Sequence, residues 1–243
     1  MISVEEINTE YRAPWGYPCP NESVRVFIRW LAGARYARVL SICSGGEMPF
    51  LAFLPRSEEV IAIDHSKKSL AVAQAKLQLI ARLGIPAWRA LLDKPWEDFS
   101  KVWTEACKNY PAAHWIINQY NYRDLQKVWR NVPLPYAHHA LARIDRLKLV
   151  LGDLTAGEKY APFDTIYLSN AMEHISQHGC YLRDKKAEIV AMLKPGGVIL
   201  YTIAALNSMS TYGRANGFDN ATRIAHGTFS SCHWSYEVWR KPA

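Results

Sequence analysis

The segment VLSICSGGEMPFLAFLPRSEEVIAIDHS, residues 39–66, decides the fold of this chain. Two short β-branched runs, at 37–43 and 60–64, flank a short helical segment at 47–55. Because both runs are apolar almost throughout, each predicts a strand that is buried on both faces, as in a parallel sheet. The Ser-Gly-Gly turn after the first run predicts a place where backbone N–H groups can approach a ligand, because glycine permits sharp turns without a side chain.

The alternation of strands and helices continues outward from this segment. Strands are predicted at 147–154, 163–170 and 198–203, helices at 22–36, 65–84 and 171–193, a turn at 194–197 and a closing hairpin at 221–241. Ser66 is a candidate cap of the 65–84 helix, and Gly84 is its predicted end. We therefore predict an α/β fold with a Rossmann-like, doubly wound sheet, mostly parallel with a C-terminal antiparallel strand.

The rhythm breaks at residues 85–146, which are rich in Trp, Tyr, His and Pro. We interpret this stretch as a helical insertion between the second and third strands, and residues 1–36 as an N-terminal lid and helix. Aromatic insertions beside a site often cover it. A chain of 243 residues with 49% hydrophobic content fits one domain, spanning 1–243.

The cysteines argue against a metal or a redox centre. There are five of them, and no two have CxxC spacing: Cys19, Cys43, Cys107, Cys180 and Cys232. This excludes the usual zinc-ribbon, iron–sulfur and thioredoxin patterns, so we predict no metal. Scattered reduced thiols are typical of a cytoplasmic protein.

Charge and hydropathy limit the partners. The net charge of +7 permits an acidic partner, but the chain has no dense run of Lys and Arg, so nucleic acid is not the expected substrate. No stretch approaches the roughly 20 apolar residues of a membrane span. The N-terminus has no basic region followed by an apolar one, so we expect no signal peptide and no membrane span.

Polar residues follow four of the predicted strands, at Ser41–Glu47, Asp64, Asp153–Leu154 and Asn170–Glu173. In open α/β sheets, ligands bind at the carboxyl ends of the strands, so these groups should meet in one crevice. Each has a simpler alternative: a tight turn for the glycines, a helix cap for Asp64, a surface turn for Asp153 and a helix cap for Glu173.

The spacing of these groups suits a nucleoside. Asp64 follows the glycines by roughly 20 residues, and a carboxylate there can accept both hydroxyls of a ribose. Asp153 can accept an adenine amino group while the backbone N–H of its neighbour contacts the ring. This pattern by itself fits NAD as well as S-adenosylmethionine.

The order VLSICSGG, VIAIDHS, VLGDL, FDTIYLSNAMEHI and LKPGGVILY resembles the class I S-adenosylmethionine-dependent methyltransferase fold, over roughly 37–84 and 147–203. The first motif departs from the usual pattern. Ser41 stands where an acidic residue is common, Cys43 where the first glycine is common, and Glu47 where the last is common. The usual carboxylate that holds the methionine amino group is therefore missing.

A narrower resemblance fits those departures. The segment from VLSICSGGEMPF to VIAIDHSKKSL, with IYLSNAMEHI downstream, is similar to 3-amino-3-carboxypropyl transferases of the diacylglycerylhomoserine-synthase type, and to enzymes that cyclise the same arm to azetidine-2-carboxylate. The resemblance implies S-adenosylmethionine as substrate or co-substrate, a small-molecule acceptor or none, and methylthioadenosine as product. A small-molecule methyltransferase, a nucleic-acid modifier and a non-catalytic binding module remain alternatives.

The candidate residues follow from this reading. Asn170, Glu173 and Tyr212 are the candidate catalytic residues, because Asn170 and Glu173 follow the fourth strand and Tyr212 lies in the loop after the fifth. Tyr11 and Arg12 can hold the carboxylate of the amino acid arm. The full predicted cofactor-binding set is Tyr11, Arg12, Ser41, Cys43, Ser44, Gly45, Asp64, His65, Asp153, Leu154 and Asn170.

Overall fold

The fold is taken from a computed structural model of the 243-residue chain. It describes residues 24, 27, 28, 37–53, 57–114, 116–169, 182–203, 219–229 and 232–243. The predicted lid and helix at 1–36 therefore lie almost wholly outside the described residues.

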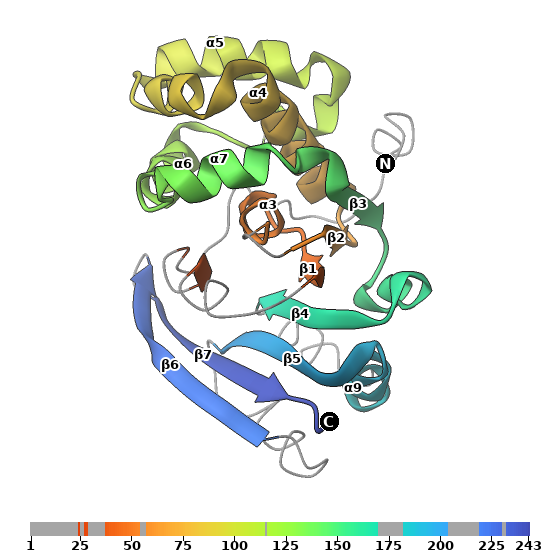
Figure 1. The fold of residues 1–243 in the computed structure, drawn as a ribbon. Coiled ribbons are helices and arrows are strands. Elements are labelled where there is room, and N and C mark those ends of the chain that lie inside the picture. Colours follow the sequence, from red (N-terminus) through yellow and green to blue (C-terminus); the bar gives the residue numbers. More distant parts are fainter. Residues whose placement is uncertain are drawn as a thin grey trace.

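One seven-stranded sheet, in the order β3-β2-β1-β4-β5-β7-β6, forms the centre of the described structure (Figure 1). Strands β3, β2, β1, β4 and β5 all run parallel to one another, which confirms the predicted Rossmann-like parallel sheet. Strand β7 pairs antiparallel with β5, and β6 pairs antiparallel with β7, so β7 is the reversed strand of the described sheet. The strands are β1 (Arg38–Ile42), β2 (Glu59–Asp64), β3 (Leu147–Leu151), β4 (Phe163–Ser169), β5 (Leu193–Ile203), β6 (Asp219–Phe229) and β7 (Cys232–Arg240).

Alternate side chains of the central strands enter two different cores. On β1, Val39 belongs to one hydrophobic cluster and Leu40 to the other, and on β2 the same holds for Ala62 and Ile63. This alternation follows from the two-residue repeat of a strand. Since both faces are covered, a doubly wound sheet explains why these strands are apolar throughout.

The helices of the described residues cover the two faces unequally. Figure 1 shows α4 to α7 packed together on one side of the sheet, away from α9. Three of these helices, α5 to α7, lie between β2 and β3 in the chain, where the helical insertion is predicted. The helices are α3 (Glu47–Leu51), α4 (Lys67–Leu92), α5 (Trp96–Ala106), α6 (Gln119–Arg130), α7 (Leu134–Leu141) and α9 (Leu182–Ala191).

Helix α4 differs from the prediction at its end. Its start is as expected, because the Ser66 side chain accepts a hydrogen bond from the Ser69 N–H at 3.2 Å. Gly84 interrupts the helix with φ 75° and ψ 163°, but the chain becomes helical again and continues to Leu92. Pro86 stands in the first turn of the resumed part, where a missing N–H costs no hydrogen bond. Gly84 is thus a kink rather than an end.

The predicted 194–197 turn lies inside β5 as the structure delimits it. Leu193 pairs with Phe163, and Val198 pairs with Thr165. Between these two pairs, β5 moves on by five residues while β4 moves on by only two. The intervening residues 194–197 bulge out of the ladder. Gly196 has φ 73°, a left-handed conformation that glycine adopts without strain.

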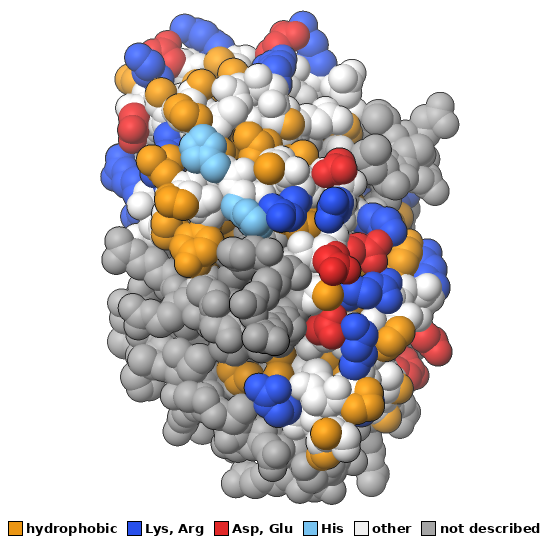
Figure 2. Space-filling view, in the orientation of Figure 1, with side chains coloured by type: hydrophobic (Ala, Val, Ile, Leu, Met, Phe, Trp, Pro, Cys, Tyr) orange, Lys and Arg blue, Asp and Glu red, His pale blue; other side chains and the backbone are white. Residues whose placement is uncertain are grey.

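Two surface properties bear on the expected partners. No helix among the described residues is both long and apolar enough to cross a membrane. On the face drawn in Figure 2, acidic and basic side chains of the described residues lie side by side and are not gathered by sign. That part of this face therefore offers no continuous basic surface of the kind that nucleic-acid phosphates attract.

Candidate functional site at the carboxyl edge of the sheet

The glycine-rich turn after β1 is pressed against helix α4. The Cys43 N–H donates to the Ile63 carbonyl at 2.8 Å, and the Gly46 N–H closes the turn on the Cys43 carbonyl at 2.8 Å. Ser44 has φ 46° and Gly46 has φ 95°. A Cβ added at Gly46 would lie 2.8 Å from the Ala73 Cβ, so only glycine fits this approach. The predicted set included Ser44 and Gly45 but missed Gly46.

Asp64 ends β2 beside this turn, with only 5% of its surface exposed. Its Oδ1 accepts the Ser66 N–H at 2.9 Å. Burial raises the pKa of Asp64 to about 6, against the opposing effects of the Ser66 N–H, the His65 charge and the Ser44 N–H. The Ser44 contribution ties the carboxylate to the glycine-rich turn.

The helix-cap alternative for Asp64 is resolved by its neighbours. Ser66, not Asp64, caps α4, and Asp64 instead supports the two residues between β2 and the helix. The His65 ring is 74% exposed and has its Nδ1 3.8 Å from Asp64 Oδ1. Asp64 and His65 therefore form a polar pair at the carboxyl end of β2, with the carboxylate inside and the imidazole outside.

Ser41 and Cys43 are placed near the turn, but their side chains are fully buried. The Ser41 hydroxyl donates to the Ile42 carbonyl at 2.9 Å. Burial raises the pKa of the Cys43 thiol well above its usual value, and the nearby charge of Asp64 raises it further. The thiol is therefore neutral, and its role in binding a cofactor stays a prediction.

The loop after β3 joins the same edge. The Gly152 N–H donates to the Asp64 carbonyl at 3.0 Å, which holds the two strand ends together. The Asp153 carboxylate caps the 3-10 helix Leu154–Tyr160 by accepting from the Thr155 N–H at 2.9 Å and from the Thr155 hydroxyl. The Leu154 side chain is buried in the α9-side core, so only its main chain can meet a ligand.

A buried ion pair lies directly behind the turn, and the sequence did not predict it. Glu47, the first residue of α3, pairs with Lys76 of α4, and each side chain is only 2% exposed. Glu47 Oε1 also accepts the Trp129 Nε1–H at 3.4 Å, while Oε2 has no hydrogen-bond partner among the described residues. Burial raises the pKa of Glu47, and Lys76 opposes that rise.

The other predicted site residues lie outside the described residues. These are Tyr11, Arg12, Asn170, Glu173 and Tyr212. The described structure thus brings together the glycine-rich turn, Asp64 with His65, and the start of the Asp153 loop. Among the described residues, no group of three or more His, Cys, Asp or Glu side chains is placed to hold a metal ion.

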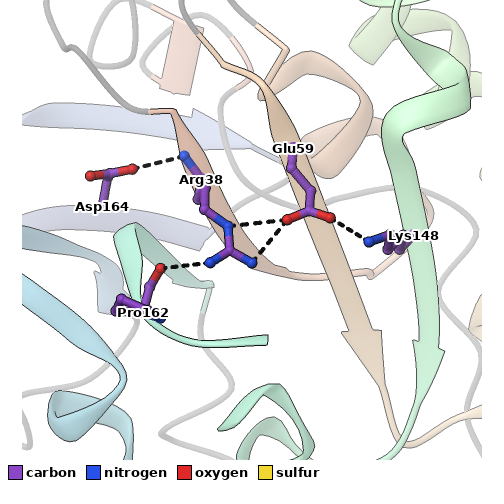
Figure 3. Close-up of polar contacts among 5 residues, drawn as sticks. All are labelled: Arg38, Glu59, Lys148, Pro162 and Asp164. Atoms are coloured by element: carbon purple, nitrogen blue, oxygen red, sulfur yellow. Dashed lines mark hydrogen bonds and ion pairs between the residues drawn. The ribbon is translucent and has the colours of Figure 1, made fainter. Parts of the chain in front are cut away.

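The opposite, amino edge of the sheet is built from ion pairs (Figure 3). The Arg38 guanidinium donates to Glu59 Oε2 from Nε at 3.1 Å and from Nη2 at 3.0 Å, and Lys148 pairs with the other oxygen of Glu59. The Arg38 N–H donates to Asp164 at 2.9 Å, and Lys194 binds the same carboxylate at 2.8 Å. These contacts join the starts of β1 to β5.

The strand order and the carboxyl-edge turn together define the class I S-adenosylmethionine-dependent methyltransferase fold. Among solved structures, the chain is similar to the N-methyltransferase NodS from Bradyrhizobium japonicum WM9 in complex with S-adenosyl-L-homocysteine, at 12% identity and TM-score 0.50 over 90% of this chain and 86% of that chain. It is similar to cofactor-bound Rv0187 from MTB, at 12% identity and TM-score 0.50 over 98% and 85% of the two chains.

A third similar structure is precorrin-6y C5,15-methyltransferase from Geobacter metallireducens GS-15, at 12% identity and TM-score 0.50 over 90% of this chain and 88% of that chain. At these identities the likeness establishes the fold and leaves the reaction open. No protein-family model matches the chain, and no curated protein matches it in sequence.

Proposed function

We propose that this protein binds S-adenosylmethionine at the carboxyl edge of its sheet and acts on the 3-amino-3-carboxypropyl arm, releasing methylthioadenosine. The observation that carries the binding proposal is the buried Asp64 carboxylate, held beside the left-handed turn at Ser44 and Gly46. Solved structures of the same fold include one in complex with S-adenosyl-L-homocysteine.

The described residues suit the nucleoside half of this ligand. A carboxylate offers about four acceptor positions, and the Ser66 and Ser44 N–H groups use two of those on Asp64. The remaining positions can accept the two ribose hydroxyls. Asp153 follows the end of β3 at the same edge of the sheet, where its carboxylate would accept an adenine amino group.

The end of β1 supports chemistry on the amino acid arm. Ser41 donates its hydroxyl to a backbone carbonyl, and Glu47 is paired with Lys76. Among the described residues at this strand end, no carboxylate is thus left to pair with the ammonium of the arm. An ammonium that is not held in an ion pair at this strand end gives up its proton more readily to a base placed beside it. A neutral amine is what self-cyclisation requires.

In the proposed cyclisation, the amine nitrogen of the arm forms a bond to its γ-carbon, and the bond from that carbon to sulfur breaks. The sulfur keeps the electron pair and leaves as methylthioadenosine, and the amine gives up one proton. We assign Glu173 as the group that takes this proton and Asn170 as the group that orients the amine. Tyr212, with Tyr11 and Arg12, would hold the arm's carboxylate.

The test is to incubate the purified protein with S-adenosylmethionine alone and to identify the products by mass spectrometry. Methylthioadenosine together with azetidine-2-carboxylate, above a no-enzyme blank, is the expected result. Intact S-adenosylmethionine would exclude self-cyclisation. In that case, small acceptors are added, and methylthioadenosine then indicates transfer of the arm to one of them.

A small-molecule methyltransferase is the second candidate. It is favoured by the described fold itself, because two of the similar structures are methyltransferases by name. S-adenosylhomocysteine as the product, in place of methylthioadenosine, would establish methyl transfer and overturn the proposal for the amino acid arm.

A further inference from the structure

The buried pair of Glu47 and Lys76 touches the glycine-rich turn on one side and the helical insertion on the other. We propose that this pair, held from the insertion by Trp129, positions the turn for S-adenosylmethionine, so that the insertion sets the affinity of the site. The inference rests on the proposed function, since it concerns the same cofactor site. Glu47, Lys76 and Trp129 are positioning residues in this account and do not contact the ligand.

The turn is attached to α4 at two adjacent points. Gly46 contacts Ala73 so closely that a Cβ would overlap it, and Glu47 pairs with Lys76. Ala73 and Lys76 are three residues apart, so they lie on the same face of the helix. Because Gly46 precedes α3 and Glu47 begins it, any displacement of the carboxylate moves the turn directly.

Stability alone explains this pair poorly. A buried ion pair contributes little net stability, because removing both charges from water offsets their attraction. This pair is also incompletely satisfied, since Glu47 Oε2 is buried without a hydrogen-bond partner among the described residues. What the pair does supply is a fixed geometry, because either partner left alone would be a buried, uncompensated charge.

The insertion reaches this pair through one side chain. Trp129 of α6 donates a hydrogen bond to Glu47. The centroid of its ring lies 6.0 Å from that of Phe50 in α3 and 5.6 Å from that of Trp88. Phe50 is in the same short helix as Glu47. A shift of α6 is therefore transmitted both to the carboxylate and to the helix that carries it.

The experiment compares W129F with W103F. Both variants remove an indole from the buried aromatic core of the insertion, but Trp103 Nε1 has no hydrogen-bond partner among the described residues, and its ring stacks on Phe99. We expect W129F to raise the Kd for S-adenosylmethionine roughly 3- to 10-fold, the size expected for loss of one hydrogen bond of ordinary strength, since the Trp129–Glu47 contact is long at 3.4 Å. W103F should change the Kd less than about twofold, although both lower the melting temperature.

A second comparison separates positioning from stability. K76M leaves Glu47 buried without its cation, so it should lower the melting temperature and raise the Kd. Adding E47Q removes the uncompensated charge, and we expect the double variant to recover stability but not affinity. If the double variant recovered both its melting temperature and its Kd, the Glu47–Lys76 pair would have only a structural role. Equal changes of Kd in W129F and W103F would lead to the same conclusion. Absence of binding by the wild-type protein would instead overturn the cofactor proposal and this inference with it.

Discussion

Glu59 and Asp64 are the first and last residues of the same strand, β2, and their surroundings differ in kind. Glu59 lies between two cations, Arg38 and Lys148. Asp64 has no Lys or Arg ion pair among the described residues and is held by backbone N–H groups, with His65 nearby. One strand thus carries a neutralised carboxylate at one end and a carboxylate without a strong counter-charge at the other.

The pKa shifts of the two carboxylates express this difference. Burial alone would raise both, but the hydrogen bonds and charges of Lys148 and Arg38 outweigh it and lower the pKa of Glu59. At Asp64, burial prevails and the pKa rises to about 6. The amino edge is arranged to stabilise the fold, whereas the carboxyl edge retains acceptor capacity at an energetic cost, as binding sites often do.

Exchanging the charge at each end of β2 tests the comparison most directly. Asp64→Asn should weaken S-adenosylmethionine binding by about 100-fold, or about 3 kcal/mol, because a charged acceptor for the ribose is lost. Glu59→Gln should leave the Kd unchanged and lower the free energy of unfolding by about 1 kcal/mol. Isothermal titration calorimetry and urea unfolding measure the two quantities. If the two variants bound S-adenosylmethionine with equal Kd values, Asp64 would have no part in the binding site.

The pH dependence of stability should have opposite signs at the two ends. The pKa of Asp64 rises from 3.8 to about 6, so between these values the folded state binds more protons than the unfolded state. This contribution should lower the free energy of unfolding as pH rises through that window, by on the order of 2–3 kcal/mol.

Glu59 acts in the other direction, because its folded pKa lies below its ordinary value of 4.5. Its stabilising contribution to the free energy of unfolding is fully present above pH 4.5 and is lost as the pH falls through the pKa of the folded state. Urea unfolding of the wild type, D64N and E59Q across this acidic range measures both contributions. The wild type and D64N should diverge between about pH 4 and pH 6; parallel curves would contradict the raised pKa.

Glycine substitutions compare the backbone at the two edges. Gly46 at the carboxyl edge and Gly196 at the amino edge both have left-handed φ, but only Gly46 faces a close neighbour. Gly46→Ala should cost about 2 kcal/mol of unfolding free energy, from strain and overlap with Ala73, whereas Gly196→Ala should cost about 1 kcal/mol. Thermal unfolding compares them, and only Gly46→Ala should also weaken cofactor binding. If the two substitutions lowered the free energy of unfolding equally, α4 would move easily enough to accommodate the added methyl group.

The smallest effect is expected at Lys148, a half-exposed cation of the amino edge. Lys148→Met should lower the free energy of unfolding by about 0.5 kcal/mol at low salt and less at high salt, because exposed ion pairs are weak and screened. Its Kd for S-adenosylmethionine should equal that of the wild type. A loss above about 2 kcal/mol would show that the amino-edge network is strongly cooperative.

Much of the central fold could be predicted because its determinants are local. The runs at 37–43 and 60–64 are apolar and bounded by turn residues, and they form β1 and β2 nearly as expected. The end of α4 was less accessible to sequence reasoning. Gly84 does break the helix, but whether the chain resumes a helix after it depends on packing, and Ile85 and Trp88 are buried in the core.

The polar residues at the strand ends of the candidate site could be predicted from the sequence, but the buried contacts behind them could not. Asp64 follows from its position after a buried strand, and Ser66 from its place before a helical pattern. The pairing of Glu47 with Lys76 and Trp129 spans 29 and 82 residues of sequence, which no local pattern reveals. One signal was present, since Lys76 stands within the apolar stripe of its helix, beside Leu77 and one turn from Ala73.

The reversed strand has a consequence for how the chain is made. In the described sheet, β6 adjoins only β7, and β7 joins it to β5, although β6 is synthesised first. On the ribosome, β6 must therefore wait without a partner until residues 232–240 have emerged. The edge of β5 is open during that interval and exposes unpaired backbone groups to other nascent chains. Completion of the described sheet therefore follows the synthesis of β7, and any delay between the synthesis of β6 and that of β7 would prolong this vulnerable state.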